Sequence, residues 1–393
     1  MERIYLDHAA TTPVLPEVCD VFTSYMKSDW GNPSSLYDFS DGPRQAVMEA
    51  RFHTASLIHA DPKCIFFTSG GSESDSWALI CGARLLQEQG NHIIVSAIEH
   101  HAILHAAKFL ESEGFDVTYL APDTAGFIRP EALRLAMRPD TIFVSIMMAN
   151  NEIGTIQPIG ELSYIAHHFG CEGCLFHTDA VQAYGQIPID VNRQGIDLLS
   201  ASSHKIYGPK GIGLLYIRDG ITLTPLIFGG GQEGGIRGGT ENVPAIAGFG
   251  TAAKIAAMQM QQTIRHERML RDYLIRRVLN EIPFCRLNGS LKNRLPGNAN
   301  FAFEYIEGSS LLMMLDAQGI CASSGSACSS ASADPSHVLT AIGLSPNLAR
   351  ASLRLTLGRE TTKKELDTVV SILKETIGQL RSISDSYQER ILR

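Results

Sequence analysis

Short apolar segments bounded by turn residues recur through the first 220 residues of the chain. Several are continuous apolar runs, which is typical of strands covered on both faces. We expect strands at 64–68, 92–97, 117–120, 141–148, 175–178, 198–201 and 212–217. Between many of them lie stretches compatible with helices, such as 73–89, 101–113 and 161–169. This alternation predicts an α/β domain with a mainly parallel sheet.

The pattern changes at a glycine-rich stretch, 229–239, which predicts a loop. After it, apolar residues at helical spacing predict one long helix over 243–281. The remainder has a mixed α+β pattern and ends in a charged helix at 361–380. We expect a large α/β domain over 16–258. A smaller α+β domain over 1–15 and 259–393 would carry a loop at about 322–333.

Composition excludes several classes of protein. The chain has 393 residues, of which 44% are hydrophobic and 19% charged, so it is an ordinary globular protein. Its formal net charge of −8 argues against a general nucleic-acid binder, which needs a basic face. No apolar run approaches the roughly 20 residues that span a bilayer. The first residues, MERIYLDHAATTP, lack a signal peptide's apolar segment, so we expect a cytoplasmic protein without membrane or nucleic-acid partners.

Eight cysteines are too few for a disulfide scaffold in a chain of this length. Cys171 and Cys174 form a Cys-x-x-Cys motif, which can be a redox pair or half of a metal site. The sequence has no second motif of this kind. We therefore favour two loop thiols without a function.

Three strand ends carry residues that suit one cofactor. Lys205, in SSHK, could form a Schiff base with an aldehyde, although a solvated loop lysine is the simpler interpretation. Asp179, in HTDAVQ, could pair with a protonated pyridine nitrogen or merely cap a helix. The segment 68–74, TSGGSES, could bind a phosphate at a helix N-terminus, or Ser could be an ordinary N-cap. Ligands bind outside the carboxyl ends of strands, so these residues would converge on one crevice.

The full order of motifs resembles the pyridoxal-phosphate cysteine desulfurases. The matching motifs are YLDHAATTP near the start, GNPSS at 31–35, FTSGGSES at 67–74, EHHAI at 99–103, NNEIG at 150–154, HTDAVQ at 177–182, SSHK at 202–205, GGGQEGGIRGGTENV at 229–243, SSGSACSSAS at 323–332 and SLRLTLGR at 352–359. The SSGSAC segment, followed by PSHVL, is similar to the NifS/IscS branch, which serves iron–sulfur cluster assembly.

This resemblance implies a homodimeric fold-type-I enzyme with a seven-stranded, mainly parallel sheet and pyridoxal 5′-phosphate as cofactor. It implies that L-cysteine is converted to L-alanine and that the sulfur passes to Cys328 as a persulfide. The sulfur would then go to an acceptor such as an iron–sulfur scaffold. No resident metal is implied, although Cys328 is a candidate transient ligand of a cluster.

The resemblance also implies roles for individual residues. The catalytic residues would be Lys205 as the Schiff-base lysine, Cys328, and His100, which stacks on the ring and can handle protons. The other implied cofactor contacts are Asp179 at the pyridine nitrogen, Gln182 and Asn151 near the phenolic oxygen, Gly71, Ser72, Ser202 and His204 at the phosphate, and Thr240 from the neighbouring subunit. Asn32 and Arg354 would bind the substrate, although a surface ion pair is the simpler interpretation of Arg354. Ser72 stands where the family usually has threonine, which keeps a hydroxyl.

Cys328 decides the type of reaction. It lies among Ser, Gly and Ala, which cannot pack a core, so we expect a mobile segment over 322–333. Twelve extended residues reach up to roughly 40 Å, enough to visit both a buried site and the surface. An unperturbed thiol with a pKa of about 8.5 is only slightly ionised near neutrality, so capture of sulfur needs local help.

Three alternatives remain open at this point. A class-V aminotransferase would share the lysine but would need no cysteine loop, so Cys328 argues against it. A selenocysteine lyase also uses a loop cysteine. A docking partner for sulfur assembly that has lost catalysis would not need lysine, aspartate, histidine and cysteine together.

Overall fold

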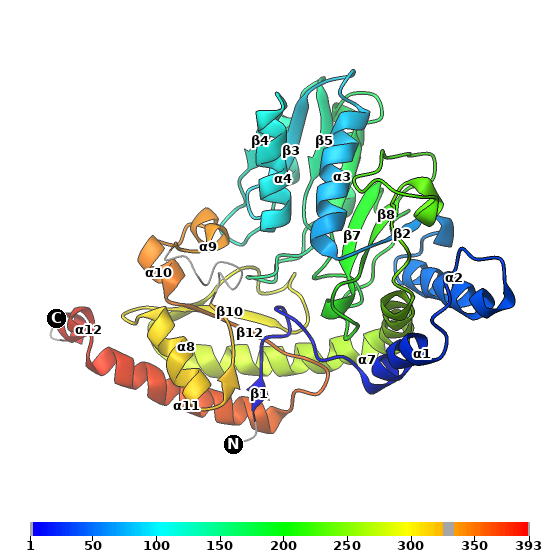
Figure 1. The fold of residues 1–393 in the computed structure, drawn as a ribbon. Helices are drawn as coiled ribbons and strands as arrows, with labels where there is room; N and C mark the ends of the chain where they lie inside the picture. The colour runs from blue at the N-terminus through cyan, green and yellow to red at the C-terminus, as the bar shows by residue number, and fades with distance from the viewer. Residues whose placement is uncertain (1–2, 325–333, 392–393) are drawn as a thin grey trace.

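The computed structural model describes residues 3–324 and 334–391, and within them a seven-stranded sheet has the order β2-β8-β7-β6-β5-β3-β4 (Figure 1). Its strands are β2 (Ile65–Thr68), β3 (His92–Ser96), β4 (Asp116–Leu120), β5 (Thr141–Ser145), β6 (Leu175–Asp179), β7 (Leu198–Ser202) and β8 (Gly213–Ile217). β8 is antiparallel to β2 and β7, and the other pairs are parallel. The predicted mainly parallel sheet is confirmed, with one strand in each of the seven expected segments.

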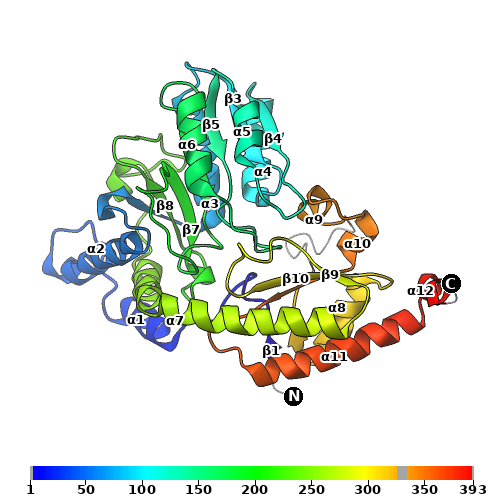
Figure 2. The ribbon, with the colours of Figure 1, turned by 180° about the vertical axis from the view of Figure 1, so that it is seen from behind.

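Helices cover both faces of this sheet. α3 (Gly71–Leu85) and α4 (His101–Ser112) lie over one face, and α5 (Pro130–Ala136) and α6 (Ile159–Phe169) lie over the other (Figures 1 and 2). Every residue of β3, β5, β6, β7 and β8 is buried. Burial on both faces is why these strands read as continuous apolar runs.

The long predicted helix is α7 (Val243–Glu281), which lies across the lower part of Figure 1. Its first half, including Ile246 and Phe249, packs into the core around the large sheet. Its second half, including Leu270 and Leu274, packs into a separate core. One continuous helix therefore joins both cores, and the boundary at residue 258 stays a prediction.

The second core is built on a three-stranded antiparallel sheet and a two-stranded parallel one. The strands are β12 (Ser352–Thr356), β10 (Asn298–Phe303) and β9 (Cys285–Leu287) in the first, and β1 (Ile4–Tyr5) and β11 (Ile320–Cys321) in the second. The helices of this part are α8 (Gly308–Ala317), α11 (Lys363–Ser382) and α12 (Asp385–Ile391). α9 (His337–Ala341) and α10 (Pro346–Arg350) pack in a third apolar cluster, which also includes Ile98 and Ile153. α11 is the charged helix expected near the end, and it begins at a capping box formed by Thr362 and Glu365.

The glycine-rich stretch is not wholly a loop. It contains a short 3-10 helix, η4 (Gln232–Gly235), so the prediction was wrong there. The buried carboxylate of Glu233 explains the difference, because it pairs with Arg51 at 2.8 Å and accepts from the backbone N–H of Phe67 at 3.0 Å. Such anchoring through side chains cannot be read from the glycine pattern.

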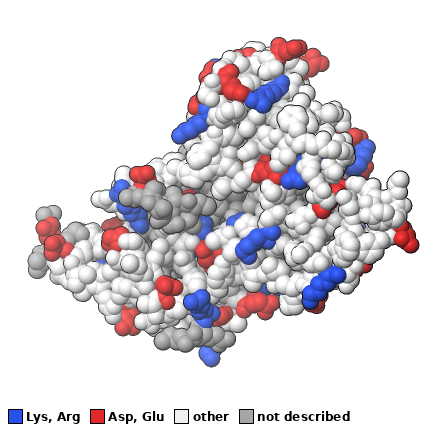
Figure 3. Space-filling model, in the orientation of Figure 1, with Lys and Arg blue, Asp and Glu red and all other residues white. Residues whose placement is uncertain are grey.

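Figure 3 shows acidic and basic side chains scattered over one face, with no continuous basic patch among the described residues on view. No helix in residues 3–324 and 334–391 is long and apolar enough to cross a membrane.

α1 (Pro16–Lys27) and α2 (Asp41–Ser56), which the pattern did not predict, pack on the first half of α7. A Cβ atom on Gly250 would lie 2.4 Å from the Cα of Ala50. We therefore predict that Gly250→Val lowers the stability of the protein by about 1–3 kcal/mol, because backbone in contact cannot make room. The exposed helical Gly378 has no heavy atom within 4 Å of such a Cβ, so Gly378→Ala should not lower the thermal unfolding midpoint. Equal midpoints for the two variants would contradict this packing.

Candidate active site

A cavity of about 300 Å³ lies at the carboxyl ends of the parallel strands. Ten residues singled out from the sequence line it: Gly71, Ser72, His100, Asn151, Asp179, Gln182, Ser202, His204, Lys205 and Arg354. Asn32 and Thr240 are exposed and do not line it, and Thr240 was expected to serve a neighbouring subunit. Cys328 lies outside the described residues.

Strand topology explains why these residues meet. Asp179 is the last residue of β6, and Lys205 ends a 3-10 helix, η3 (Ser203–Lys205), that follows β7. β6 and β7 pair in parallel, with Asp179 opposite Ser200. His100 caps α4 shortly after β3. The carboxyl ends of neighbouring parallel strands open onto the same edge of the sheet, so all these side chains reach one crevice.

Asp179 is a buried carboxyl group that faces the cavity. Burial raises its pKa to about 6, while the N–H of Val181, at 2.8 Å, and the charge of Lys205 act against this rise. Behind it, burial lowers the pKa of His177 to about 3, so this ring is neutral. His177 is held by hydrogen bonds with the hydroxyls of Ser145 and Ser200 at 2.9 and 3.0 Å.

Asp75 is a cavity residue that the sequence analysis missed. Its carboxyl is 1% exposed, and its Oδ1 lies 3.8 Å from the Nε2 of His177. Burial and the nearby Asp179 raise its pKa well above the usual range, so Asp75 is neutral and Asp179 carries the charge. Its spacing in the sequence could have revealed it, because Asp75 lies four residues after Gly71 and therefore on the same face of α3.

The amine of Lys205 is held by the backbone of the N-terminal segment. Its Nζ donates to the carbonyl oxygens of Ala9 at 2.5 Å and Ala10 at 2.7 Å. The side-chain amide of Gln182 also donates to Ala9, at 3.0 Å. The YLDHAATTP segment therefore forms one wall of the cavity and holds the side chain of Lys205, which follows β7 in the chain.

One end of the cavity is suited to an anion. α3 begins there, so its unpaired backbone N–H groups and helix dipole favour negative charge. A Cβ on Gly71 would lie 2.7 Å from Cγ2 of Val181, so glycine is needed for this close approach. The buried Ser202 lines the same cavity, as does His204, whose Nδ1 lies 3.1 Å from the Thr11 hydroxyl. Burial lowers the pKa of His204 to about 4, so it is a neutral donor or acceptor.

His100 has a defined tautomer. Its Nδ1 accepts a hydrogen bond from the backbone N–H of Ala102 at 3.2 Å, as the N-cap of α4. A neutral ring therefore carries its proton on Nε2. Burial and the charge of Lys205 lower the pKa of His100, which favours this neutral form.

Arg354 is 2% exposed, which excludes the alternative of a surface ion pair. It donates to Asp7 Oδ1 at 2.8 Å and to the carbonyl of Asn151 at 3.1 Å. Its Nε has no hydrogen-bond partner among the described residues. Asp7, also missed in the sequence, accepts from the hydroxyl of Ser323 at 2.7 Å.

The two flanks of the segment that contains Cys328 are anchored at this site. Ser323 exchanges two backbone hydrogen bonds with Arg354, at 2.7 and 3.3 Å. On the other side, the hydroxyl of Ser336 donates to Glu152 at 2.5 Å, and Glu152 follows Asn151 in the chain. Both described flanks therefore contact residues of the cavity wall or their direct neighbours.

Cys171 and Cys174 are buried free thiols just before β6. Burial raises the pKa of both thiols, so neither is a ready thiolate. No group of three or more His, Cys, Asp or Glu side chains in the described ranges could hold a metal ion.

Comparison with known proteins decides the family. Residues 4–369 match the model of the aminotransferase class-V family. Cysteine desulfurase IscS of Dictyoglomus turgidum is 50% identical over 387 residues, which cover 98% of both chains. The Methanosarcina thermophila IscS is 49% identical over 98% of this chain and 94% of its own. The chain belongs to the cysteine desulfurases of the class-V aminotransferase family.

Solved structures of this family share the fold over nearly the whole chain. A NifS-like protein superposes with a TM-score of 0.90 at 35% identity and covers 96% of this chain and 100% of its own. SspA in complex with cysteine has a TM-score of 0.79 at 38% identity, over 91% of this chain and 100% of its own. The fold is therefore that of the fold-type-I pyridoxal-phosphate enzymes, as cysteine desulfurases are.

In this desulfurase Glu152 offers a test of the wall near Arg354. Burial raises its pKa from 4.5 to about 7. A raised pKa in the folded state means that the contribution of Glu152 to stability is present below about pH 4.5 and is lost as the pH rises through about 7. The side chain stays neutral in Glu152→Gln. We therefore predict that the thermal unfolding midpoint of this variant rises relative to that of the wild type between pH 5 and 8. A difference that does not change with pH would contradict the assignment.

Proposed function

We propose that this protein is a cytoplasmic, homodimeric cysteine desulfurase that uses pyridoxal 5′-phosphate. It converts L-cysteine to L-alanine and carries the sulfur as a persulfide on Cys328, for iron–sulfur cluster assembly or another acceptor. The observation that carries this proposal is the convergence of Lys205, Asp179 and Arg354 on one cavity, in a chain about 50% identical to IscS proteins.

The cavity suits the cofactor at both ends. Gly71, Ser72, Ser202 and His204 would hold the phosphate at the start of α3. Asp179 would hold the pyridine nitrogen, because a buried carboxylate that faces the cavity is stabilised in its ionised form by a protonated nitrogen. When bound, pyridoxal phosphate supplies an aldehyde that condenses with amines and a ring that withdraws electrons from the substrate α-carbon. His100, Asn151 and Gln182 would contact the ring.

Two groups are placed to handle the α-proton of the substrate. Lys205 reaches the cavity from the end of β7, and its amine is held by two carbonyl oxygens. His100 carries its ring proton on the nitrogen that does not cap α4. We assign the basic role to Lys205 and keep His100 as the alternative, since both line the same cavity.

Cys328 completes the reaction. Its thiolate attacks the sulfur of the substrate, the bond between this sulfur and the β-carbon breaks, and the β-carbon takes up a proton to give alanine. The flanking residues Ser323 and Ser336 bond to groups around the cavity, which supports access of the segment to the substrate. The outer sulfur of the persulfide then passes to an acceptor, which restores the thiol of Cys328.

A dimer is supported by the apolar surface of the loop between α1 and α2. Three large side chains there, Trp30, Leu36 and Tyr37, are 68%, 101% and 57% exposed. Phe228, at the start of the glycine-rich stretch, is 82% exposed. Contiguous apolar groups on a surface often mark a site where a partner binds. In the dimer Thr240 would complete the phosphate site of the other subunit.

Cys328→Ser provides the test of the sulfur-transfer step. We expect no persulfide and a loss of sulfide release from L-cysteine, while the yellow colour of the bound cofactor remains, because the ring site does not use this thiol. Mass spectrometry of the wild type after incubation with L-cysteine should find one added sulfur atom on Cys328. Sulfide release at the native rate by Cys328→Ser, or a keto acid product without persulfide, would contradict the proposal.

Arg354→Lys tests recognition of the substrate carboxylate. Lysine keeps the charge but loses the planar pair of donors that binds a carboxylate. We predict that kcat/KM for L-cysteine falls by about 10- to 100-fold, as expected for the loss of a hydrogen bond to a charged group. The matched control is Arg350→Lys on α10, whose guanidinium lies at the surface and should leave kcat/KM unchanged. An unchanged kcat/KM in Arg354→Lys would place the carboxylate elsewhere.

A further inference from the structure

Asp7 contacts two parts of the site but does not itself line the large cavity. Its Oδ1 accepts a hydrogen bond from Arg354 at 2.8 Å, and its Oδ2 accepts one from the hydroxyl of Ser323 at 2.7 Å. Arg354 lines the cavity, whereas Ser323 belongs to the described flank of the segment that contains Cys328. One carboxylate therefore joins the arginine of the cavity wall to this flank.

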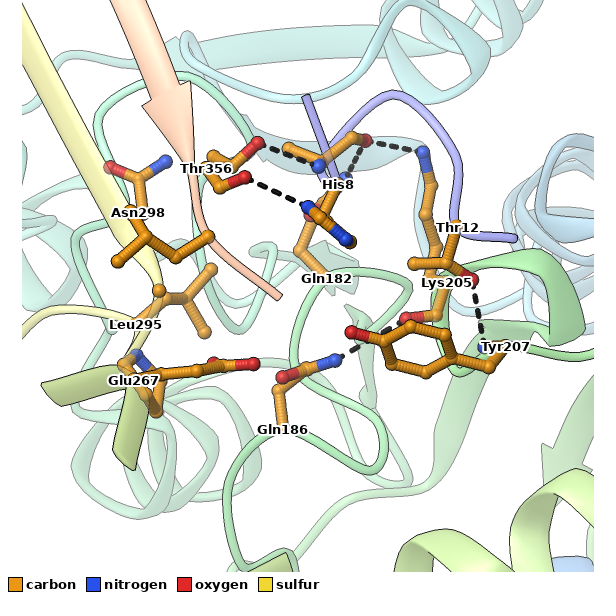
Figure 4. A pocket seen from close by; sticks show the side chains of 14 residues that line it. His8, Thr12, Gln182, Gln186, Lys205, Tyr207, Glu267, Leu295, Asn298 and Thr356 are labelled. Atoms are coloured by element: carbon orange, nitrogen blue, oxygen red, sulfur yellow. Dashed lines mark hydrogen bonds between the residues drawn. The ribbon is translucent and has the colours of Figure 1, made fainter. Parts of the chain in front are cut away.

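The backbone on both sides of Asp7 is fixed by the two smaller sheets. Before it, the N–H of Leu6 donates to the carbonyl oxygen of Cys321 at 2.9 Å. After it, the N–H of His8 donates to the carbonyl oxygen of Thr356 at 3.3 Å. In Figure 4 the ring of His8 also lies beside Thr356, with its Nδ1 at 3.0 Å from the same oxygen. Cys321 and Thr356 each lie two residues from a group that the carboxylate binds, so the position of Asp7 is set by the strands of its own partners.

Bonds to two different nitrogens orient the guanidinium of Arg354. Its Nη2 donates to Asp7, and its Nη1 donates to the carbonyl oxygen of Asn151 at 3.1 Å. A guanidinium is planar and has five N–H donors, so two bonds fix its plane and leave donors for a carboxylate in the cavity. The Nε atom, for instance, has no partner among the described residues. Since the side chain is 2% exposed, Asp7 also supplies the counter-charge that a buried cation needs.

Ser323 is held by the backbone of Arg354 as well as by Asp7. The N–H of Ser323 donates to the carbonyl oxygen of Arg354 at 3.3 Å, and the N–H of Arg354 donates to that of Ser323 at 2.7 Å. The hydroxyl bond to Asp7 is the charge-assisted contact of the three. Cys328 follows Ser323 by five residues, which span at most roughly 17 Å. An anchor at Ser323 therefore limits the distance between the thiol and Arg354.

We propose that Asp7 is a positioning residue that holds the substrate-binding Arg354 and the flank of the Cys328 segment at a fixed offset. The inference deepens the proposed function and rests on it, because it assigns a task to groups of that site. L-Cysteine is a short molecule, so binding its carboxylate determines where its sulfur lies. The thiol of Cys328 must meet the sulfur at that place. Asp7 sets both ends of this distance, with one oxygen on Arg354 and the other on Ser323.

A role of Asp7 as a counter-charge alone makes the opposite prediction. The substrate carboxylate and Asp7 would then compete for one cation, and removal of Asp7 would let Arg354 bind the substrate more tightly. If Asp7 orients the guanidinium, its removal weakens binding, because binding must then also order the arginine side chain. The direction of the change in affinity separates the two roles.

L-Alanine isolates the part of the test that concerns Arg354, since it has the carboxylate of L-cysteine but no sulfur. Its dissociation constant is measured from the change in absorbance of the bound cofactor. We predict roughly tenfold weaker binding in Asp7→Ala, as expected for the loss of a hydrogen bond to a charged group. Asp7→Asn should bind more tightly than Asp7→Ala, because the amide oxygen still accepts from Arg354. Unchanged or tighter binding in Asp7→Ala overturns the proposal.

The matched control for this measurement is Asp219→Ala. Asp219 also forms an ion pair, with Lys63 at 2.7 Å, but on the exposed surface. Asp219→Ala should bind L-alanine as the wild type does, which shows that loss of an ion pair alone does not change the affinity.

Ser323→Ala tests the link to the Cys328 segment. We predict an unchanged affinity for L-alanine, together with roughly fivefold slower formation of the persulfide in a single turnover with L-cysteine, followed by mass spectrometry. In the Asp7→Ala background the same substitution should slow the step no further, because the hydroxyl has already lost its partner. No slowing by Ser323→Ala alone, or an equal slowing in both backgrounds, overturns the link.

The outcomes separate this inference from the proposed function. A wild type that binds no cofactor, or whose cofactor does not respond to L-alanine, overturns the proposed function. A wild type that responds, with an Asp7→Ala variant of equal affinity, overturns only the role of Asp7. Asp7→Ala leaves a buried cation without its partner, so its thermal unfolding midpoint is measured first.

If Asp7→Ala does not fold, a crystal structure of the wild-type holoenzyme with L-alanine decides. A guanidinium of Arg354 that binds Asp7 and the ligand carboxylate at the same time supports the inference. A guanidinium that has left Asp7 for the ligand overturns it.

Discussion

The parallel pairing of β6 with β7 is the constraint on which the site depends. It places Asp179 opposite Ser200, so the carboxyl of Asp179 and the amine of Lys205 both emerge at the same edge of the sheet. Both strands are fully buried, which fixes the backbone from which these two side chains extend. The N-terminal segment then binds Lys205 through two carbonyl oxygens, so part of the chain far away in sequence completes the wall.

Burial also sets the charges of the site. Asp75, Glu99 and Asp179 are buried near one another, and burial raises the pKa of each. Like charges at short range in a poorly solvated interior cannot all be ionised. Only Asp179 has both the N–H of Val181 and the charge of Lys205 to favour its ionised form. The result is a cavity in which Asp179 is the ionised carboxylate and Lys205 and Arg354 are the basic side chains, which suits a zwitterionic substrate and a charged cofactor.

Much of the large sheet could be predicted because buried strands require continuous apolar runs, and α7 because its apolar residues keep helical spacing along its whole length. Lys205 and Asp179 could be predicted from their places at strand ends. Asp7 could not. Its importance comes from its contact with Arg354, hundreds of residues away in the sequence, and such a contact leaves no local pattern. α1 and α2 were missed for a similar reason, because packing on α7 stabilises them.

The central claim is that Lys205, rather than another amine, reacts with the aldehyde of the cofactor. The most direct measurement is to load the protein with pyridoxal phosphate, reduce it with borohydride and locate the stable adduct by peptide mapping. We predict that the adduct is on Lys205 alone and that the absorbance of the bound cofactor is lost on reduction. An adduct on the neighbouring Lys210 or on any other lysine, or no adduct at all, would contradict the account.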